Sequence, residues 1–193
     1  MDFDRLREKH EDALIELMNQ YGDYLLRTAI LLVKDYQTGE EVVQDTFVTA
    51  FEKIDQLQDE EKLKSWLTTI AVNGCRSRMR RWSWKNIRLH FDTSMELLEA
   101  DESAVDPEEA LLTKTADEKL SEAIQSLDYK YREIVVLFYF NELKISDIAT
   151  YTHLKENTVK TRLKRGRNML KDIIEKGEGY DDCGEESDKS ATQ

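Results

Sequence analysis

Two stretches of the sequence carry Lys and Arg side chains along predicted helices. Residues 62–91 contain eight Lys or Arg and no Asp or Glu, and residues 155–171 contain seven Lys or Arg against one acid, Glu156. Such cations neutralise phosphates, and Arg and Asn side chains can also hydrogen-bond base edges. A solvated helix face is the alternative for either stretch alone, but two such stretches favour nucleic-acid binding.

No set of residues has the spacing of an active site or a metal site. His10, His90 and His153 are isolated, and the sequence contains no P-loop, nucleophile elbow or dinucleotide fingerprint. Cys75 and Cys183 lack metal-ligand spacing, which indicates free thiols in a reducing compartment, with Cys75 as a small packing residue. We therefore expect no enzyme activity, no cofactor, no metal and no small-molecule substrate.

The net charge of −12 is compatible with nucleic-acid binding because the charges are segregated. Acidic residues crowd into residues 92–109 and 175–188, outside both basic stretches. Gly and Pro are scarce, at 7 and 1, which favours helices over a β-sandwich or a Rossmann fold. The charged N-terminus and the short apolar runs predict a soluble, cytoplasmic protein without a signal peptide.

Apolar residues spaced by three to four positions predict an all-α fold of two small helical domains joined by a flexible acidic linker. The predicted helices span residues 10–34, 40–53, 62–81, 120–127, 131–140, 144–150 and 156–174. Residues 35–39 are predicted to form a turn, and Gly22 to mark a bend or close packing. The predicted boundaries are 10–83 for the first domain, 84–114 for the linker, 115–176 for the second domain and 177–193 for a disordered acidic tail.

The last two predicted helices have the layout of a helix-turn-helix, in which a short helix and a turn precede a longer basic helix. At about 100° per residue, the apolar residues of the last helix form one stripe and the basic residues project away from it. The residues expected to contact duplex DNA are Asn157, Thr158, Lys160, Thr161, Arg162, Lys164 and Arg165. A plain amphipathic helix with a solvated basic face is the alternative.

The basic helix at 62–81 lies beside three tryptophans, a combination found in proteins that bind single-stranded DNA. Trp66 falls on the apolar stripe and is expected in the core. Trp82 and Trp84 are the candidates for stacking on exposed bases, although they could instead cover the end of the helix.

With both basic helices placed, the chain resembles the extracytoplasmic-function (ECF) sigma factors of the sigma-70 family. The segment EEVVQDTFVTAFEKID is similar to region 2.2, and KLKSWLTTIAVNGCRSRMRR is similar to regions 2.3 and 2.4. The segment LDYKYREIVVLFYFNELKISDIATYTHLKENTVKTRLKRGRNMLK is similar to region 4. The resemblance implies a region 2 bundle and a region 4 helix-turn-helix that direct RNA polymerase to promoters of a stress or envelope response.

The resemblance also implies roles for particular residues. Glu41, Gln44 and Asp45 would bind the clamp helices of the polymerase β′ subunit, and Asn73 would line a pocket for a flipped base of the −10 element. The basic residues that would accompany Asn73 are Arg76, Arg78, Arg80 and Arg81. Region 4 would read the −35 element and contact the β flap, and an anti-sigma factor, often membrane-bound, would occlude both domains.

The helix-turn-helix departs from the common family pattern at three positions. Lys144 and Lys155 stand where Ser or Thr often caps a helix, so about 1 kcal/mol of capping is forgone at each. His153 replaces a frequent glycine in the turn, where a left-handed conformation is expected.

Two other functions stay open on the sequence alone. A conventional helix-turn-helix regulator would carry an N-terminal dimerisation domain and read paired half-sites as a symmetric dimer. A nucleic-acid-processing enzyme would require a metal or nucleophile constellation, which the sequence does not offer.

Overall fold

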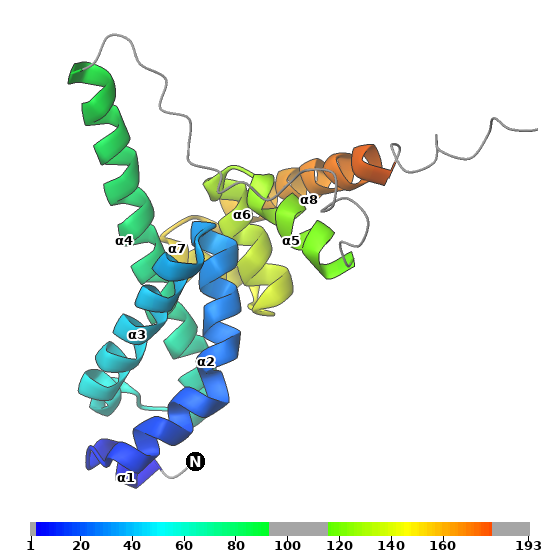
Figure 1. The fold of residues 1–193 in the computed structure, drawn as a ribbon. Helices are drawn as coiled ribbons and strands as arrows, with labels where there is room; N and C mark the ends of the chain where they lie inside the picture. The colour runs from blue at the N-terminus through cyan, green and yellow to red at the C-terminus, as the bar shows by residue number, and fades with distance from the viewer. Residues whose placement is uncertain (1–2, 93–115, 179–193) are drawn as a thin grey trace, which may run out of the picture.

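The computed structural model describes residues 3–92 and 116–178, and every regular element in these ranges is helical (Figure 1). The elements are α1 (Phe3–Arg7), α2 (Glu11–Val33), α3 (Tyr36–Lys53), the 3₁₀-helical turns η1 (Ile54–Gln56) and η2 (Glu60–Lys62), α4 (Leu63–Asp92), α5 (Ala116–Ser126), α6 (Tyr129–Val135), the π-helical turn η3 (Val136–Phe140), α7 (Ile145–Thr152) and α8 (Glu156–Glu178). The predicted all-α fold is confirmed for these residues.

Helices α2, α3 and α4 pack together as one bundle, with α1 at its far end (Figure 1). The apolar stripes predicted from the sequence face the interior, where Leu25, Phe47 and Leu67 are among the buried side chains. Met18 of α2 lies outside this interior, with its side chain 43% exposed. Since burial of apolar surface is the main favourable contribution to folding, these three stripes hold the bundle together.

The predicted turn at residues 35–39 is wrong, because α3 begins directly after Asp35. The Asp35 carboxylate accepts a hydrogen bond from the Thr38 backbone N–H at 2.6 Å, and hydrogen bonds from Thr38 lower the pKa of this carboxyl. Asp35 is therefore an N-cap, which satisfies one of the free donors of the first helical turn. Gly39 lies inside the helix, and an added Cβ there would be 3.0 Å from Ile30 Cγ1, so glycine allows α2 and α3 to approach closely.

Helix α4 extends beyond its predicted end at Arg81 and finishes at Asp92. No Gly or Pro interrupts residues 81–92, so nothing in that segment stops the helix. Figure 1 shows this end of α4 projecting beyond the other helices, where no apolar stripe is required. Residues 84–92, assigned to the linker from the sequence, are thus helical. The rest of the predicted linker and most of the predicted tail lie outside the described residues.

Helices α5 to α8 form the second group of helices. The predicted helix at 131–140 is divided into α6 and the π-helical turn η3, which ends where the Asn141 N–H donates to the Val136 carbonyl at 3.0 Å. The turn between α7 and α8 contains His153 with φ 54°, so the expected left-handed conformation is present. Lys144 is the N-cap of α7 and makes no side-chain capping hydrogen bond, as its side chain led us to expect.

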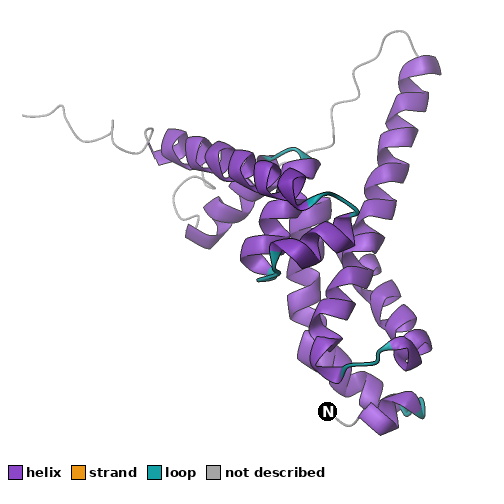
Figure 2. Ribbon diagram, turned by 180° about the vertical axis from the view of Figure 1, so that it is seen from behind, coloured by secondary structure: helices purple, strands orange, loops and turns teal. Residues whose placement is uncertain are grey.

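The two groups of helices are in contact, as the view from behind shows (Figure 2). Helix α2 lies against α5, α6 and η3. The Tyr24 and Phe140 rings stack across this contact, with 6.1 Å between their centroids and 9° between their planes. None of the helices in the described ranges combines the length and the apolarity that crossing a bilayer requires.

Candidate nucleic-acid interface

Helix α8 presents the cationic surface that the sequence predicts for duplex DNA. Val159 is fully buried and Gly166 is buried against α6, which fixes one side of the helix on the rest of the second group. Of the predicted DNA contacts, five are exposed and two, Thr158 and Arg162, are half-buried. The exposed ones are Asn157, Lys160, Thr161, Lys164 and Arg165. An exposed row of this kind, at the N-terminal end of a helix held by α7, can enter a major groove.

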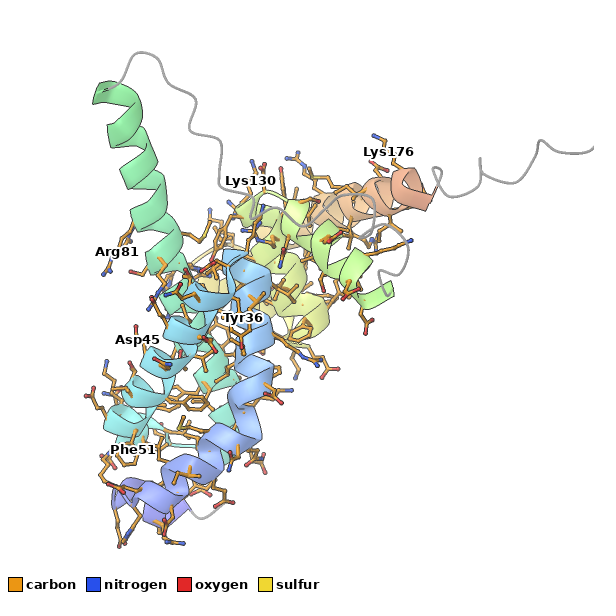
Figure 3. The ribbon with its side chains drawn as sticks, in the orientation of Figure 1. Tyr36, Asp45, Phe51, Arg81, Lys130 and Lys176 are labelled. Carbon is orange, nitrogen blue, oxygen red and sulfur yellow. The ribbon has the colours of Figure 1, made fainter. Side chains whose placement is uncertain are left out.

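The basic side of α4 carries two exposed and two half-buried arginines. Arg80 and Arg81 are exposed, and Figure 3 shows Arg81 on the outer side of α4, away from the other helices. Asn73 is exposed as well, and its side-chain oxygen accepts a hydrogen bond from Arg76 Nη1 at 3.3 Å. Arg76 and Arg78 are half-buried, and each forms an ion pair with an acidic side chain of another helix.

The acidic side of α3 lies next to this basic helix. Glu41, Gln44 and Asp45 are all exposed, and Asp45 is labelled on α3 in Figure 3. Arg78 Nη2 lies 2.8 Å from Asp45 Oδ2 and 3.7 Å from Glu41 Oε2. Arg78 therefore joins the acidic side of α3 to the basic side of α4. Val48, one helical turn after Gln44, adds an apolar side chain that is 58% exposed.

Two further residues behave as the sequence analysis expected. Cys75 is fully buried on α4, and burial raises the pKa of its thiol to about 12. Trp66 is partly buried and packs against the core. The side chains of Trp82 and Trp84, the candidates for base stacking, lie outside the described residues. Within the part of the chain that the structure describes, no three His, Cys, Asp or Glu side chains are grouped so that they could hold a metal ion.

A set of buried polar residues lies between the two groups of helices and was not predicted from the sequence. Arg132 and Glu133 are 2% and 5% exposed, and Asn141 is 4% exposed. Arg132 donates to the Leu32 carbonyl of α2 at 2.8 Å. Charged residues are rarely buried unless they are paired, so nothing in their local sequence pattern predicts this position.

Two protein families match the chain over its helical parts. Residues 17–85 match "Sigma-70 region 2", and residues 117–170 match "Sigma-70, region 4". Together these matches cover the three-helix bundle and the helix-turn-helix, in the order expected from the sequence motifs.

Curated proteins and solved structures give the same result. The chain is 27% identical over 176 residues to "ECF RNA polymerase sigma factor SigW" of Bacillus subtilis, covering 86% of this chain and 91% of that protein. It is 28% identical over 158 residues to "RNA polymerase sigma factor SigV" of the same organism, covering 82% and 89%.

Among solved structures, the fold is similar to the sigma factor RpoE of Bartonella quintana, determined in complex with the anti-sigma factor NepR. The TM-score is 0.62 at 26% identity, and the match covers 83% of this chain and 97% of that one. Both family matches occur in the expected order, the relatives align over most of their length, and the helix-turn-helix carries an exposed cationic helix. The chain therefore belongs to the sigma-70 family and is an ECF RNA polymerase sigma factor, a subunit that directs promoter-specific initiation of transcription.

Proposed function

We propose that the two helical groups divide promoter recognition between them. Residues 10–83 would form region 2, which binds core polymerase and the −10 element, and residues 115–176 would form region 4, which binds the −35 element. The observation that carries this division is the presence of one exposed cationic helix surface in each group, on α4 and on α8. The chain would act as a specificity subunit without catalytic activity of its own.

The polymerase-docking surface would be the exposed side of α3, formed by Glu41, Gln44 and Asp45. Carboxylates and an amide suit a partner surface that offers basic and polar groups, as expected for the clamp helices of the β′ subunit. Arg78 supports this role because its ion pair with Asp45 restricts the carboxylate while leaving the Asp45 side chain 72% exposed. A carboxylate already oriented loses less conformational entropy on docking than a free one.

The −10 surface would be the basic side of α4. Asn73 would hydrogen-bond a base extruded from the opened strand, and Arg80 and Arg81 would neutralise the phosphates around it. Extrusion costs a few kcal/mol of stacking, which these contacts must offset. Amide and guanidinium groups on neighbouring helical turns supply both kinds of contact.

The −35 surface would be the N-terminal half of α8. Arg162, Arg165 and Asn157 would contact base edges, while Lys160, Lys164 and the hydroxyl groups of Thr158 and Thr161 would hold phosphates. Thr161 would hold a phosphate through a bridging water, because its one hydroxyl proton is already donated to the Asn157 carbonyl at 2.8 Å and its oxygen can then only accept.

An anti-sigma factor is the regulatory partner that we propose for both domains. The support is the similarity to RpoE, which was solved in complex with the anti-sigma factor NepR. Polymerase β′ clamp helices, the β flap and promoter DNA would be the partners of the active form.

The test is in vitro transcription from a genomic DNA library by purified core polymerase, with and without the protein, followed by sequencing of transcript starts. We expect new starts that share one −10 and −35 pair. Asp45→Ala should reduce all of them together by weakening polymerase binding, whereas Arg162→Ala should change the −35 sequence that the starts share. No new starts, together with duplex binding by a symmetric dimer, would contradict the proposal in favour of a conventional regulator.

A further inference from the structure

Arg76, one of the proposed −10 residues, is bound by the second group of helices. Its Nε donates to Glu133 Oε1 of α6 at 2.5 Å, and its Nη1 donates to the Tyr151 carbonyl of α7 at 2.7 Å. One guanidinium group on the proposed −10 surface thus contacts both α6 and the first helix of the helix-turn-helix.

Glu133 is held in place from its own helix as well. The Tyr129 hydroxyl donates to Glu133 Oε1 at 3.0 Å, and burial together with the charge of Glu133 raises the pKa of Tyr129, so the hydroxyl stays protonated and keeps donating. Glu133 is 5% exposed. A buried carboxylate with two donors is a strong, specific acceptor for the Arg76 guanidinium.

Binding of Arg76 to region 4 and to DNA cannot occur together. The guanidinium has five N–H donors in one plane, and it binds a phosphate or a guanine in bidentate fashion through Nε with Nη2 or through Nη1 with Nη2. The contacts to Glu133 and Tyr151 engage one donor of each pair, and Nη2 itself is buried. Because the Tyr151 carbonyl belongs to α7, DNA cannot reach these donors until α7 moves away from α4.

Two further contacts keep the groups of helices together without using proposed DNA or polymerase residues. Arg132 donates to the Leu32 carbonyl at 2.8 Å, at the C-terminal end of α2. The Asn141 amide donates to the Tyr24 hydroxyl at 2.7 Å and to Thr28 Oγ1 at 2.9 Å. Both anchors are almost fully buried.

Not all polar atoms buried between the two groups of helices are hydrogen-bonded. Arg76 Nη2, Arg132 Nε and Asn141 Oδ1 are buried polar atoms without a hydrogen-bond partner among the described residues. Each such atom lowers the net stabilisation that its residue provides. An interface with one unsatisfied atom in each of Arg76, Arg132 and Asn141 is suited to being opened by a competing partner.

We infer that region 4 of this chain is an intramolecular partner of its own −10 surface: Glu133 and the Tyr151 carbonyl bind Arg76, hold the free chain closed, and release Arg76 only when the two domains separate. This inference rests on the proposed function of α4. It makes Glu133, Asn141 and Tyr24 positioning residues for the closed form, with no role in the open one.

The first test measures closure in the full chain by energy transfer. Dyes are attached at the exposed positions Asn19→Cys on α2 and Asn168→Cys on α8, in a Cys183→Ser background that leaves buried Cys75 in place. Glu133→Gln should lower the energy transfer, since it removes the charge but keeps the shape. The matched control is Glu142→Gln, which removes an exposed charge from the same domain and should leave the transfer unchanged.

The second test uses a fluorescent single-stranded DNA of random 12-nucleotide sequence and the free protein. Glu133→Gln should bind it on the order of tenfold more tightly than the parent, since hydrogen bonds that involve charged groups are the strong ones. The control Glu142→Gln should change the affinity for this DNA only slightly, because it removes one exposed charge that salt screens. Equal energy transfer and equal DNA binding for Glu133→Gln and its control would overturn the inference.

A third variant protects the test against a folding defect. Tyr24→Phe removes one of the two acceptors of the Asn141 amide on α2 and keeps the ring that stacks on Phe140. It should also lower the energy transfer, and an unchanged value would count against the closed form. With saturating core polymerase, Glu133→Gln should transcribe as the parent does. Normal transcription without any change in closure would refute this inference and leave the sigma function standing, whereas absent transcription would refute the proposed function alone.

Discussion

The packing of α8 against α6 depends on a glycine, and its replacement gives the sharpest prediction about region 4. A Cβ added at Gly166 would lie 2.8 Å from Val135 Cγ2 and 3.4 Å from Tyr131 Cβ. Val135 is 1% exposed, and a β-branched side chain in a helix has little rotamer freedom, so it cannot turn away. Overpacking of this kind costs about 1–3 kcal/mol, against a gain of about 1 kcal/mol from helix propensity.

Gly22 is the matched control because it lies inside α2 with no atom within 4 Å of an added Cβ. Gly22→Ala should therefore stabilise the chain by about 1 kcal/mol, while Gly166→Ala should destabilise it by up to about 2 kcal/mol. In thermal unfolding followed by circular dichroism, each kcal/mol corresponds to a shift of about 2–4 °C for a chain of this size.

If Gly166→Ala has a melting temperature equal to or above that of the parent, the prediction is wrong, because α6 and α8 then have room for a methyl group. Coupling provides a second check. Val135→Ala removes the methyl group that the new Cβ meets, so the double variant should be less destabilised than the sum of the two single variants.

Three further predictions concern function and reactivity. Arg162→Ala or Lys160→Ala should weaken binding to −35 duplex DNA, by about 1–3 kcal/mol if Arg162 makes a bidentate base contact. The affinity for core polymerase in a pull-down titration should stay unchanged, and an equal loss of DNA affinity and polymerase affinity would contradict the domain assignment. Asp45→Ala should lower the affinity for core polymerase about tenfold in the same titration. Asp23→Ala, which removes an exposed acid from α2, should leave it unchanged, and equal affinities of the two variants would contradict α3 as the docking surface. Cys75 should resist thiol reagents at pH 8, because a pKa of about 12 leaves about one thiol in ten thousand ionised. Rapid labelling of Cys75 itself in the native protein, located by mass spectrometry, would contradict its burial.

The helical class and the two cationic helices could be predicted because each depends on local patterns. Apolar residues at helical spacing predicted the buried sides of α2, α3 and α4, and the basic residues of α8 followed from the same periodicity. Helix ends were less predictable. The start of α3 depends on the Asp35 cap rather than on Gly39, and the last part of α4 projects beyond its bundle, where apolar periodicity gives no signal.

The contacts between helices could not be read from the sequence. Arg78 and Asp45 are 33 positions apart, and Arg76 and Glu133 are 57 positions apart. Helical periodicity puts both arginines on the polar side of α4, but it says nothing about which acid lies opposite. Arg132 lies in the segment that is similar to region 4, but a long charged side chain is expected at the surface, so its burial against the Leu32 carbonyl could be seen only in the tertiary structure.

The π-helical turn η3 bears on how insertions and deletions in this family should be interpreted. A turn closed by a bond from Asn141 to the carbonyl five residues earlier contains one residue more than an α-helical turn. Removing exposed Tyr139 would let the segment close as an ordinary helix and rotate everything after it by about 100° relative to α6. Asn141 would then turn away from Tyr24. A one-residue gap in a relative at this point would therefore mark a change in the phase between the two domains, although it would look like a harmless change in loop length.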